Sequence, residues 1–412
     1  MTCMRVSLCL FVLLVAVPSG LATAQDRPWP TFETQEIDRS LTVGYAVLLQ
    51  DINEDRRPDI VVVDSRRLIW FENPSWRLHT ILGEGTTKPD NVCIAPLDVN
   101  GDGHEDLILG AGWRGFNTRE PGTLQWLEHP GRPGASWRVH PIGEVISLHR
   151  IRVGDIDGDG VKELVVAPLL GPGTTRRGNF MQRPVSLFYY EIPSGSDRSW
   201  RRETIDSESL HVMHNIWLDD LNGNGRLEVL TASYEGVRSY ELVGGRWSFV
   251  RIGAGDQSRP DRERGASEVK TGRLADGRRL VATIEPWHGD KAVVYVQEGV
   301  GIQRYRRIVL DDRLRQGHAV WCADLDGDGN DEIVIGSRQH LSETERYGVR
   351  VYRVASGDAA KWERFVLDHG GMACEDLAVD DLDGDGRLDI VAVGRATRNV
   401  RIYWNRGQER SR

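Results

Sequence analysis

The sequence predicts an all-β protein: a seven-bladed β-propeller of four-stranded blades. Three observations lead to this fold class. An acidic, glycine-rich loop recurs along the chain, each loop is followed by a β-branched strand and then an aromatic one, and a strand missing at the C-terminal end is present at the N-terminal end. A ring of blades protects its sheet edges by radial closure. We therefore expect residues 25–412 to form a single propeller domain.

The acidic loops define the repeat. The interval between the fourth and fifth loops is about twice the other intervals, so we expect a degenerate copy near Gly272, in GRLADGRRLVATIE, which has lost the carboxylates. Seven repeats then run from residue 40 to the end of the chain. The six acidic loops begin at Asp51, Asp98, Asp155, Asp220, Asp324 and Asp381.

The strands of each repeat follow its loop. A short apolar strand comes first, as at 60–63, 164–167 and 333–336, and a strand with a central aromatic residue comes next. A fourth strand opens with an aromatic residue and has Ile or Leu five positions later, as in Trp76 and Ile81, but the seventh repeat ends without one. Phe32 and Ile37 reproduce this spacing before the first loop. An N-terminal strand is thus expected to complete the last blade. The alternative fold, an open β-solenoid, would not explain why this strand is displaced to the N-terminal end.

Composition and charge limit the classes of partner that we expect. The chain has 412 residues, 40% of them hydrophobic and 27% charged, which is an ordinary soluble composition. Its formal net charge is −9 and no dense Lys/Arg stripe is present, so we expect no nucleic-acid partner. The acid surplus favours bound cations instead.

The N-terminus resembles a secretory signal. Arg5 precedes an apolar run at 6–17, and Ala22-Thr23-Ala24 follows as a small-residue cleavage site, so residues 1–24 are expected to be a signal peptide of a secreted, periplasmic or extracellular protein. The apolar run is shorter than the ~20 residues that a spanning helix needs, so no membrane span is expected in the mature chain. The three remaining cysteines, an odd number at wide spacing, are expected to be buried free thiols.

The loop pattern D-x-[DN]-x-[DN]-G-x-x-[DE] predicts calcium sites that stabilise the blades. It places oxygen ligands at positions 1, 3, 5 and 9 of a turn that glycine at position 6 allows to close, and hard oxygen ligands suit Ca²⁺. The first loop has Arg56 in the glycine position and fits less well. Solvated acidic turns and calcium-dependent ligand binding are the alternatives. The expected ligands are Asp98, Asn100, Asp102, Asp106, Asp155, Asp157, Asp159, Glu163, Asp220, Asn222, Asn224, Glu228, Asp324, Asp326, Asp328, Glu332, Asp381, Asp383, Asp385 and Asp389.

These loops, with the apolar strands after them, resemble the FG-GAP or VCBS repeats of integrin-α-type propellers. The resemblance covers essentially the whole mature chain and implies the propeller fold. It says little about function.

A second group of residues is expected at the opposite end of the channel. The position six residues before the first carboxylate of each loop lies near the start of an innermost strand, and in blades three, four and six it is histidine. Imidazoles beside a carboxylate can hold Zn²⁺ or another transition metal, or act as general acid and base; hydrogen-bonded structural histidines are the alternative. The seven positions are Tyr45, Val92, His149, His214, Ala266, His318 and Glu375, with Asn91, His211 and Glu268 close by.

The segments between second and third strands are expected to open on the same face. They carry aromatic residues beside arginines and carboxylates, which suits a sugar or a carboxylated sugar, although an arginine on a surface loop is often only a solvated charge. The residues are Trp113, Arg114, Arg176, Arg177, Tyr234, Glu235, Glu285, Trp287, His288, Arg338, His340 and Arg395.

A narrower resemblance covers the last three blades. The segments IEPWHGDKAVVY, GHAVWCADLDGDGNDEIVIG and GGMACEDLAVDDLDGDGRLDIVAVGRATRNVRIYWN are similar to the propeller part of fungal aldos-2-ulose dehydratases and related secreted bacterial propellers. The resemblance implies elimination of water from a keto-sugar such as anhydrofructose. The fungal enzymes also carry cupin domains, which we do not find in this sequence, so we expect no isomerase step of the kind attributed to a cupin.

Two functions from different classes follow. The first is a carbon-oxygen lyase (dehydratase) acting on a keto-sugar by β-elimination, which needs a base, an acid and a group that stabilises the enolate. The second is a non-catalytic, adhesion-like propeller that binds a glycan or a protein partner. Signatures of Ser-His-Asp and Cys-His nucleophiles are absent, which disfavours hydrolysis through an acyl enzyme. In the lyase, His149, His214, His318 and Glu375 divide metal binding and proton transfer, Tyr45 is a candidate acid, and Arg338 or Arg395 positions substrate.

Overall fold

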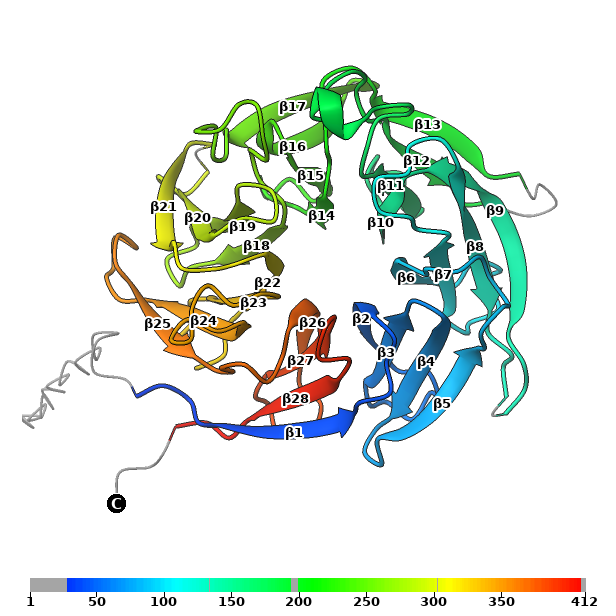
Figure 1. Cartoon of the computed structure of the whole chain (residues 1–412), viewed down its shortest axis with the longest axis horizontal. Helices are drawn as coiled ribbons and strands as arrows, with labels where there is room; N and C mark the ends of the chain where they lie inside the picture. The colour runs from blue at the N-terminus through cyan, green and yellow to red at the C-terminus, as the bar shows by residue number, and fades with distance from the viewer. Residues whose placement is uncertain (1–27, 133, 194–198, 302, 409–412) are drawn as a thin grey trace, which may run out of the picture.

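The computed structural model describes residues 28–408 except 133, 194–198 and 302. The predicted signal peptide at 1–24 lies outside this range. Seven four-stranded antiparallel sheets are arranged in a ring around a central channel (Figure 1), which confirms the predicted fold class. Within the described residues the sheets contain 28 strands, and a 3-10 helix, η2, spans Arg176–Gly178.

Six blades are built from four consecutive strands each, and the predicted degenerate copy forms blade five. Blade one has β2 (Gly44–Gln50), β3 (Asp59–Asp64), β4 (Arg67–Glu72) and β5 (Arg77–Leu82); blade two has β6 (Cys93–Leu97), β7 (Asp106–Ala111), β8 (Pro121–Glu128) and β9 (Arg138–Ile146); blade three has β10 (Leu148–Gly154), β11 (Glu163–Pro168), β12 (Leu187–Glu191) and β13 (Arg201–Asp206). Blade four has β14 (Asn215–Asp219), β15 (Glu228–Ser233), β16 (Gly236–Val243) and β17 (Arg246–Gly253); blade five has β18 (Val269–Arg273), β19 (Arg279–Glu285), β20 (Lys291–Gln297) and β21 (Tyr305–Asp311); blade six has β22 (Gly317–Ala323), β23 (Glu332–Ser337), β24 (Gly348–Val354) and β25 (Trp362–Val366).

The seventh blade joins the two ends of the chain. It contains β26 (Cys374–Asp380), β27 (Asp389–Gly394) and β28 (Val400–Asn405), and β1 (Phe32–Asp38) adds its outer strand. The strand β1 pairs antiparallel with β28, with Phe32 opposite Asn405. This pairing is the ring closure that the displaced strand predicts.

The second strand of each blade is the most deeply buried element. Every residue of β3, β7, β11, β15, β19, β23 and β27 is buried, which explains the runs of β-branched residues there. Their side chains pack between blades: Ile60 and Val62 of blade one share a cluster with Val391 and Val393 of blade seven. The apolar core is therefore divided among the blade junctions.

Third-strand tyrosines also connect neighbouring blades. The hydroxyl of Tyr352 in β24 donates to Asp311 Oδ2 at 3.0 Å, at the end of β21 in the preceding blade. The hydroxyls of Tyr240 and Tyr403 donate in the same way to an aspartate of the preceding blade. These three junctions thus combine apolar packing with a charge-assisted hydrogen bond.

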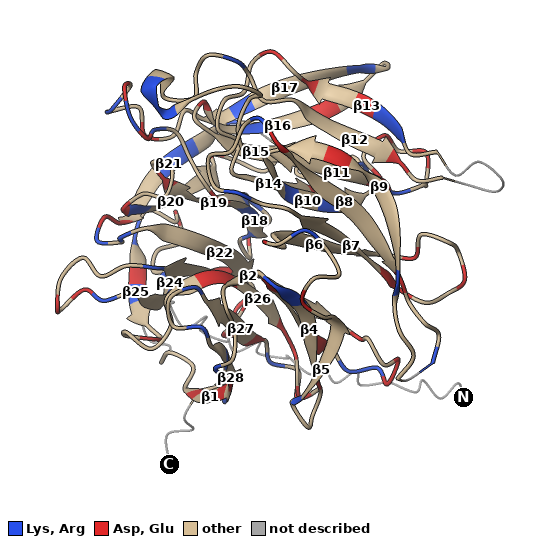
Figure 2. Ribbon diagram, turned by 45° about the vertical axis from the view of Figure 1, so that its right-hand side comes forward, with Lys and Arg blue, Asp and Glu red and all other residues tan. Residues whose placement is uncertain are grey.

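The surface is charged and mixed. Acidic and basic residues are interspersed along the outer strands and loops (Figure 2). Cys93, Cys322 and Cys374 are free thiols, as expected, and Cys322 is only partly buried. No helix within the described residues is long and apolar enough to cross a membrane.

Candidate active site in the channel

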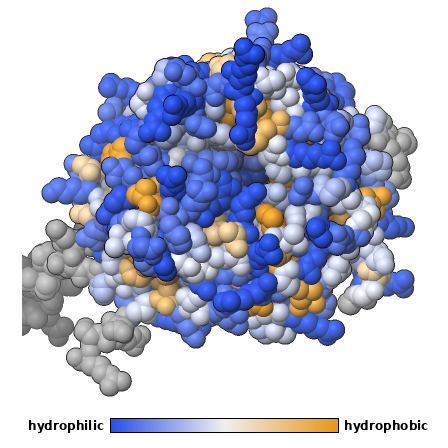
Figure 3. Space-filling view, viewed as in Figure 1, coloured by the Kyte–Doolittle hydropathy of each residue, from blue (hydrophilic) through white to orange (hydrophobic). Residues whose placement is uncertain are grey.

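A cavity of about 890 Å³ occupies one end of the channel. In the view of Figure 1, the space-filling surface is hollowed at the centre of the ring and hydrophilic there (Figure 3). All seven residues that the sequence predicts as catalytic line this cavity, although they come from five blades. They are Tyr45, His149, His214, His318, Arg338, Glu375 and Arg395.

Three imidazoles are held by backbone carbonyl groups. Nδ1 of His149 donates to the carbonyl of His214 at 2.9 Å, and Nδ1 of His318 donates to the carbonyl of Glu375 at 2.6 Å. Nδ1 of His214 donates to the carbonyl of Ser267 at 3.0 Å and lies 2.8 Å from Glu268 Oε1. Because Nδ1 carries the proton in each ring, Nε2 is left as the basic nitrogen.

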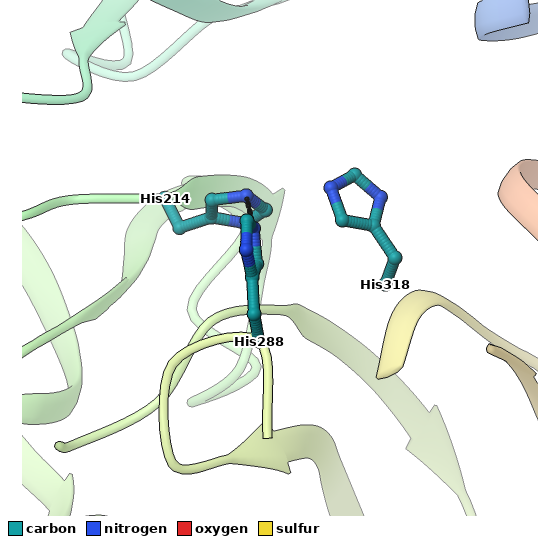
Figure 4. A group of neighbouring side chains, drawn as sticks. All are labelled: His214, His288 and His318. Atoms are coloured by element: carbon teal, nitrogen blue, oxygen red, sulfur yellow. Dashed lines mark hydrogen bonds between the residues drawn. The ribbon is translucent and has the colours of Figure 1, made fainter. Parts of the chain in front are cut away.

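A fourth imidazole completes the group. His288 lies in the loop between β19 and β20, and its Nε2 is 2.7 Å from His214 Nε2, as Figure 4 shows. Arg338 can only donate, and its guanidinium is 3.3 Å from His288 Nδ1, so Nε2 of His288 carries the proton and donates to His214. The result is a hydrogen-bonded chain that begins at Arg338 and ends next to Glu268.

Burial keeps these imidazoles neutral. Desolvation holds the pKa of His149, His288 and His318 well below the ordinary value, and nearby arginines lower it further. Desolvation also lowers the pKa of His214, although the Glu268 carboxylate partly opposes the shift. At neutral pH the site therefore presents uncharged rings that can accept a proton.

Glu375 organises the cationic side of the cavity. Its Oε2 accepts from Arg338 at 3.0 Å and its Oε1 from Arg395 at 2.7 Å, and its side chain is buried. Arg338 also donates to Gln316 Oε1 at 2.7 Å. The Arg395 guanidinium lies 5.3 Å from the ring centroid of Tyr45. Two guanidinium groups are thus fixed at the cavity wall with donors left over.

The donor set fits a transition metal. One ring nitrogen each of His214, His288 and His318 lies within 4.8 Å of the others, and the ring centroids of His214 and His318 are 5.0 Å apart. Three imidazoles are a common zinc ligand set, and hydrogen bonds at Nδ1 orient such ligands. For His288 to bind through Nε2, its proton must move to Nδ1 and Arg338 must turn away.

The structure adds residues to the predicted site and places several of the predicted loop residues outside the cavity. His288, which the sequence predicts only as a loop residue on this face, lies at the centre of the imidazole group. Arg150, Gln316 and Leu314, which no pattern in the sequence indicates, also line the cavity. Pro286, which precedes Trp287 in the same loop, lines it as well. Among the predicted loop residues, five line the cavity: Trp113, Trp287, His288, Arg338 and Arg395. Arg114, Arg176, Arg177, His211, Tyr234, Glu235, Glu285 and His340 do not line it.

Some of the predicted residues that do not line the cavity are paired with other side chains. His211 Nδ1 is 3.0 Å from Glu235 Oε1, and the buried Glu285 accepts from Tyr295 and Arg307. No pattern in the sequence separates these residues from those that reach the cavity, because the difference lies in the path of each loop.

The acidic loops occupy the other end of the inner strands and share one geometry. In the third, Asp155 accepts the backbone amides of Gly158 at 2.7 Å and Gly160 at 3.0 Å, and Glu163 Oε2 accepts that of Ile156 at 2.9 Å. The hydrogen bond from the second residue to the ninth-position carboxylate recurs in all six loops. Arg56, which replaces glycine in the first loop, has φ of 71°, so this loop forms with strain.

The chemistry of these loops fits a cation. Three of them bring carboxylate oxygens from three residues within 4.8 Å of one another. Burial first, and then the neighbouring carboxylates, raise the pKa of Glu163 to about 7 and of Glu332 to about 9. Glu332 Oε1 is buried without a hydrogen bond. A divalent cation would relieve both the repulsion and the unpaired oxygen.

Comparisons with known families agree with the propeller fold and its repeated loops. Residues 121–298 match the family model described as the aldos-2-ulose dehydratase β-propeller domain, and residues 51–109 match the FG-GAP-like repeat. An aldos-2-ulose dehydratase of Phanerodontia chrysosporium is 25% identical over 264 residues, which are 59% of this chain and 29% of the fungal protein. Integrin alpha-PS5 of Drosophila melanogaster is 26% identical over 178 residues, 37% of this chain and 17% of the integrin. The chain thus spans less than a third of either curated relative.

Solved structures show the same fold. A lectin of Agrocybe aegerita that recognises non-reducing terminal N-acetylglucosamine has a TM-score of 0.53 and 16% identity over 88% of this chain and 91% of its own. BBS1N, solved in complex with ARL6DN, has a TM-score of 0.53 and 14% identity over 92% of this chain and 97% of its own. The chain is therefore a seven-bladed propeller with FG-GAP-like repeats that resembles the propeller domain of aldos-2-ulose dehydratase.

Proposed function

We propose that this protein is a carbon-oxygen lyase that removes water from a keto-sugar by β-elimination. The observation that carries the proposal is the group of four neutral imidazoles, three of them buried and that of His288 half-buried, beside two guanidinium groups fixed on Glu375. The resemblance to the propeller domain of aldos-2-ulose dehydratase supports the substrate class.

His318 is the proposed base. Its Nδ1 proton is committed to the Glu375 carbonyl, so its Nε2 lone pair faces the cavity, and the lowered pKa keeps it unprotonated at neutral pH. The base takes the proton on the carbon next to the substrate carbonyl, the carbon-carbon double bond forms, and the β-hydroxyl leaves as water. General base catalysis of this kind typically contributes 10²–10⁴-fold to the rate.

The remaining groups supply the acid and the enolate contacts. Arg338 and Arg395 have donors available for the developing enolate oxygen. The Tyr45 hydroxyl, or His288 through its Nε2 proton, gives a proton to the departing hydroxyl. Trp113 and Trp287 line the same cavity and offer faces for a sugar ring.

A metal is a proposed addition to this site. His214, His288 and His318 would hold Zn²⁺ or another transition metal, which supplies a Lewis acid for the substrate carbonyl. A metal would occupy Nε2 of His318, so in that form His149, the imidazole outside the ligand group, would act as the base in its place. In the metal-free state, His288 and His214 share a hydrogen bond instead.

Turnover of 1,5-anhydrofructose tests the proposal. We expect the purified protein to form an unsaturated ketone, detected by its ultraviolet absorbance and by mass loss of one water. His318→Gln should lower kcat by about 10²-fold or more. The matched control is His79→Gln, because His79 stacks on Trp70 in an outer strand, far from the cavity. Absence of product from the wild-type protein, or equal rates in wild type and H318Q, overturns the proposal.

Metal content is measured on the same preparation. After a wash with a calcium-selective chelator, elemental analysis that finds about one zinc or other transition metal per chain supports the metal form. If calcium is the only metal found, the reaction rests on the acid-base groups alone.

Glycan binding without turnover is the second candidate function. Trp113, Phe116 and Trp287 line the cavity beside its arginines, which is a typical arrangement for sugar recognition. Saturable binding of a neutral oligosaccharide that Trp287→Ala abolishes, with no unsaturated product from any keto-sugar, would favour it.

We also propose that the acidic loops bind Ca²⁺ and that the protein is secreted. The buried, unpaired Glu332 Oε1 supports the calcium sites. The apolar N-terminal segment supports secretion. N-terminal sequencing of the exported protein should start near Gln25.

A further inference from the structure

A second cavity, of about 300 Å³, lies in the channel below the imidazole site. It is lined by the inner strands, and Arg150 is the residue that lines both cavities. Val47, Ile94 and Leu377 give it an aliphatic wall. This volume lies at the lower end of the range for small-molecule sites.

Two cations in this lower chamber lack a full set of partners. Lys270 in β18 is 7% exposed, and its Nζ lies 3.5 Å from the ring centroid of Trp217 and 4.8 Å from that of Trp321. Within the described residues, Lys270 forms no side-chain hydrogen bond and no ion pair within 4.0 Å. Arg152 donates to the carbonyl of Ile151 at 2.7 Å, but its Nε is buried without a partner.

Charge in the chamber does not balance. Arg150, Arg152, Lys270 and the half-buried Asp376 line the chamber, and the buried Glu268 acts on Lys270 from outside its lining, so one positive charge is in excess when Lys270 is protonated. Asp376 is already engaged, since its Oδ2 accepts the backbone amide of Val47 at 3.1 Å. A desolvated excess charge is costly unless a counter-ion binds.

The rim adds no net charge. Glu105 and Lys162, from neighbouring acidic loops, line the chamber and oppose each other. Both belong to the acidic-loop end of the inner strands, so the chamber opens toward that face and is reached independently of the imidazole site.

We propose that the lower chamber binds a small organic monocarboxylate, with its carboxylate between Lys270 and Arg152 and its apolar body against the aliphatic wall. One negative charge neutralises the excess, whereas a phosphate dianion would reverse it. The free Nε of Arg152 and the ammonium of Lys270 supply donors from two directions. An inorganic anion would leave the aliphatic wall and the two indole rings without contacts.

The state of Lys270 agrees with this assignment. Burial first, and then the neighbouring Arg152, hold the pKa of Lys270 well below its ordinary value. A bound carboxylate is the group that keeps this ammonium charged. The indole rings of Trp217 and Trp321 stabilise the cation but cannot accept its hydrogen bonds as a carboxylate does.

Benzoate is a suitable probe, with benzamide as its neutral counterpart. Isothermal titration of the full mature chain should give one saturable benzoate site. Benzamide and inorganic phosphate should each bind at least tenfold more weakly. Equal affinity for benzamide, tighter binding of phosphate, or no saturable benzoate binding overturns the proposal.

Variants place the bound anion in the chamber. Lys270→Met should weaken benzoate at least tenfold while the circular dichroism spectrum is unchanged; Arg152→Leu serves as a second variant if K270M does not fold. Lys162→Met, at the rim, is the matched control and should change affinity less than twofold. Arg395→Met separates the two cavities: loss of benzoate binding in R395M, with K270M unaffected, would place the anion in the upper cavity and refute the proposal.

Discussion

Tyr352→Phe tests whether the third-strand tyrosines hold neighbouring blades together. The Tyr352 hydroxyl in blade six donates to Asp311 Oδ2 in blade five, and the two residues are 1% and 5% exposed. The substitution removes one oxygen and leaves the ring packing unchanged. Any loss of stability therefore reports the hydrogen bond between blades.

The expected loss in the free energy of unfolding depends on the hydrogen bonds that Asp311 keeps in the variant. A hydrogen bond to a charged group contributes about 1.5–3 kcal/mol. Asp311 Oδ2 still accepts from Arg364 at 3.0 Å in the variant, so the carboxylate is not left unpaired and the loss should lie at the low end, about 1.5 kcal/mol.

The pH dependence has a definite sign. Burial raises the pKa of Asp311, but hydrogen bonds from the Arg313 amide, Arg364 and Tyr352 outweigh it and leave the pKa below its ordinary value. The contribution of this group is then fully present above the unfolded pKa of about 3.9 and is lost as the pH falls through the folded value. The deficit of the variant should shrink in that acid range.

The assay is guanidinium unfolding followed by tryptophan fluorescence and by circular dichroism, with coincident transitions required before free energies are compared. Tyr190→Phe is the matched control. Tyr190 occupies the corresponding position in blade three, but its hydroxyl forms no hydrogen bond within the described residues, so we expect a change below about 0.5 kcal/mol. Equal losses in Y352F and Y190F, or none in either, would refute the reasoning.

Three further predictions concern cations, thiols and ring closure. Without divalent cations, the free energy of unfolding should fall as the pH rises from about 4.5 to about 9. The reason is that a carboxyl whose pKa is raised on folding, such as that of Glu332, opposes folding once it ionises. A melting temperature that is equal in calcium and in EDTA at pH 8 argues against the proposed calcium sites. Cys93 and Cys374 are buried with raised pKa values and should react with a thiol reagent only after unfolding, and fast labelling of the native protein would contradict this. Removal of residues up to Asp38 deletes β1 and its hydrogen bonds with β28. This deletion should lower the free energy of unfolding by about 5 kcal/mol, at roughly 1 kcal/mol per hydrogen bond. An unchanged melting temperature would show that β1 does not close the ring.

The fold was predictable because its signals are local and repeated. Each acidic loop, β-branched strand and aromatic strand occupies a short segment, and the pattern recurs in seven repeats, six of which keep the acidic loop. The displaced outer strand was predictable for the same reason, since Phe32 and Ile37 keep the spacing of the other outer strands.

The site was predictable where it depends on the repeat and unpredictable where it depends on loops. His149, His214 and His318 lie at equivalent positions of inner strands, so the ring symmetry brings them together. His288 comes from the loop between β19 and β20, and the corresponding loops of most other blades differ from it in length. Its contact with His214 depends on the backbone path through Glu285–His288, which no periodic pattern specifies.

Blade five links these observations. It is the blade whose loop has lost the carboxylates, yet Glu268, Lys270 and His288 all come from it or from the segment that leads into it. Glu268 lies 2.8 Å from Nδ1 of His214 and favours the tautomer with the proton on that nitrogen. His288 completes the imidazole group, and Lys270 places a cation in the lower chamber. Blade five therefore contributes to both cavities although its loop has lost the carboxylates, and substitution of these three residues should affect ligand binding more than substitutions in the acidic loops do.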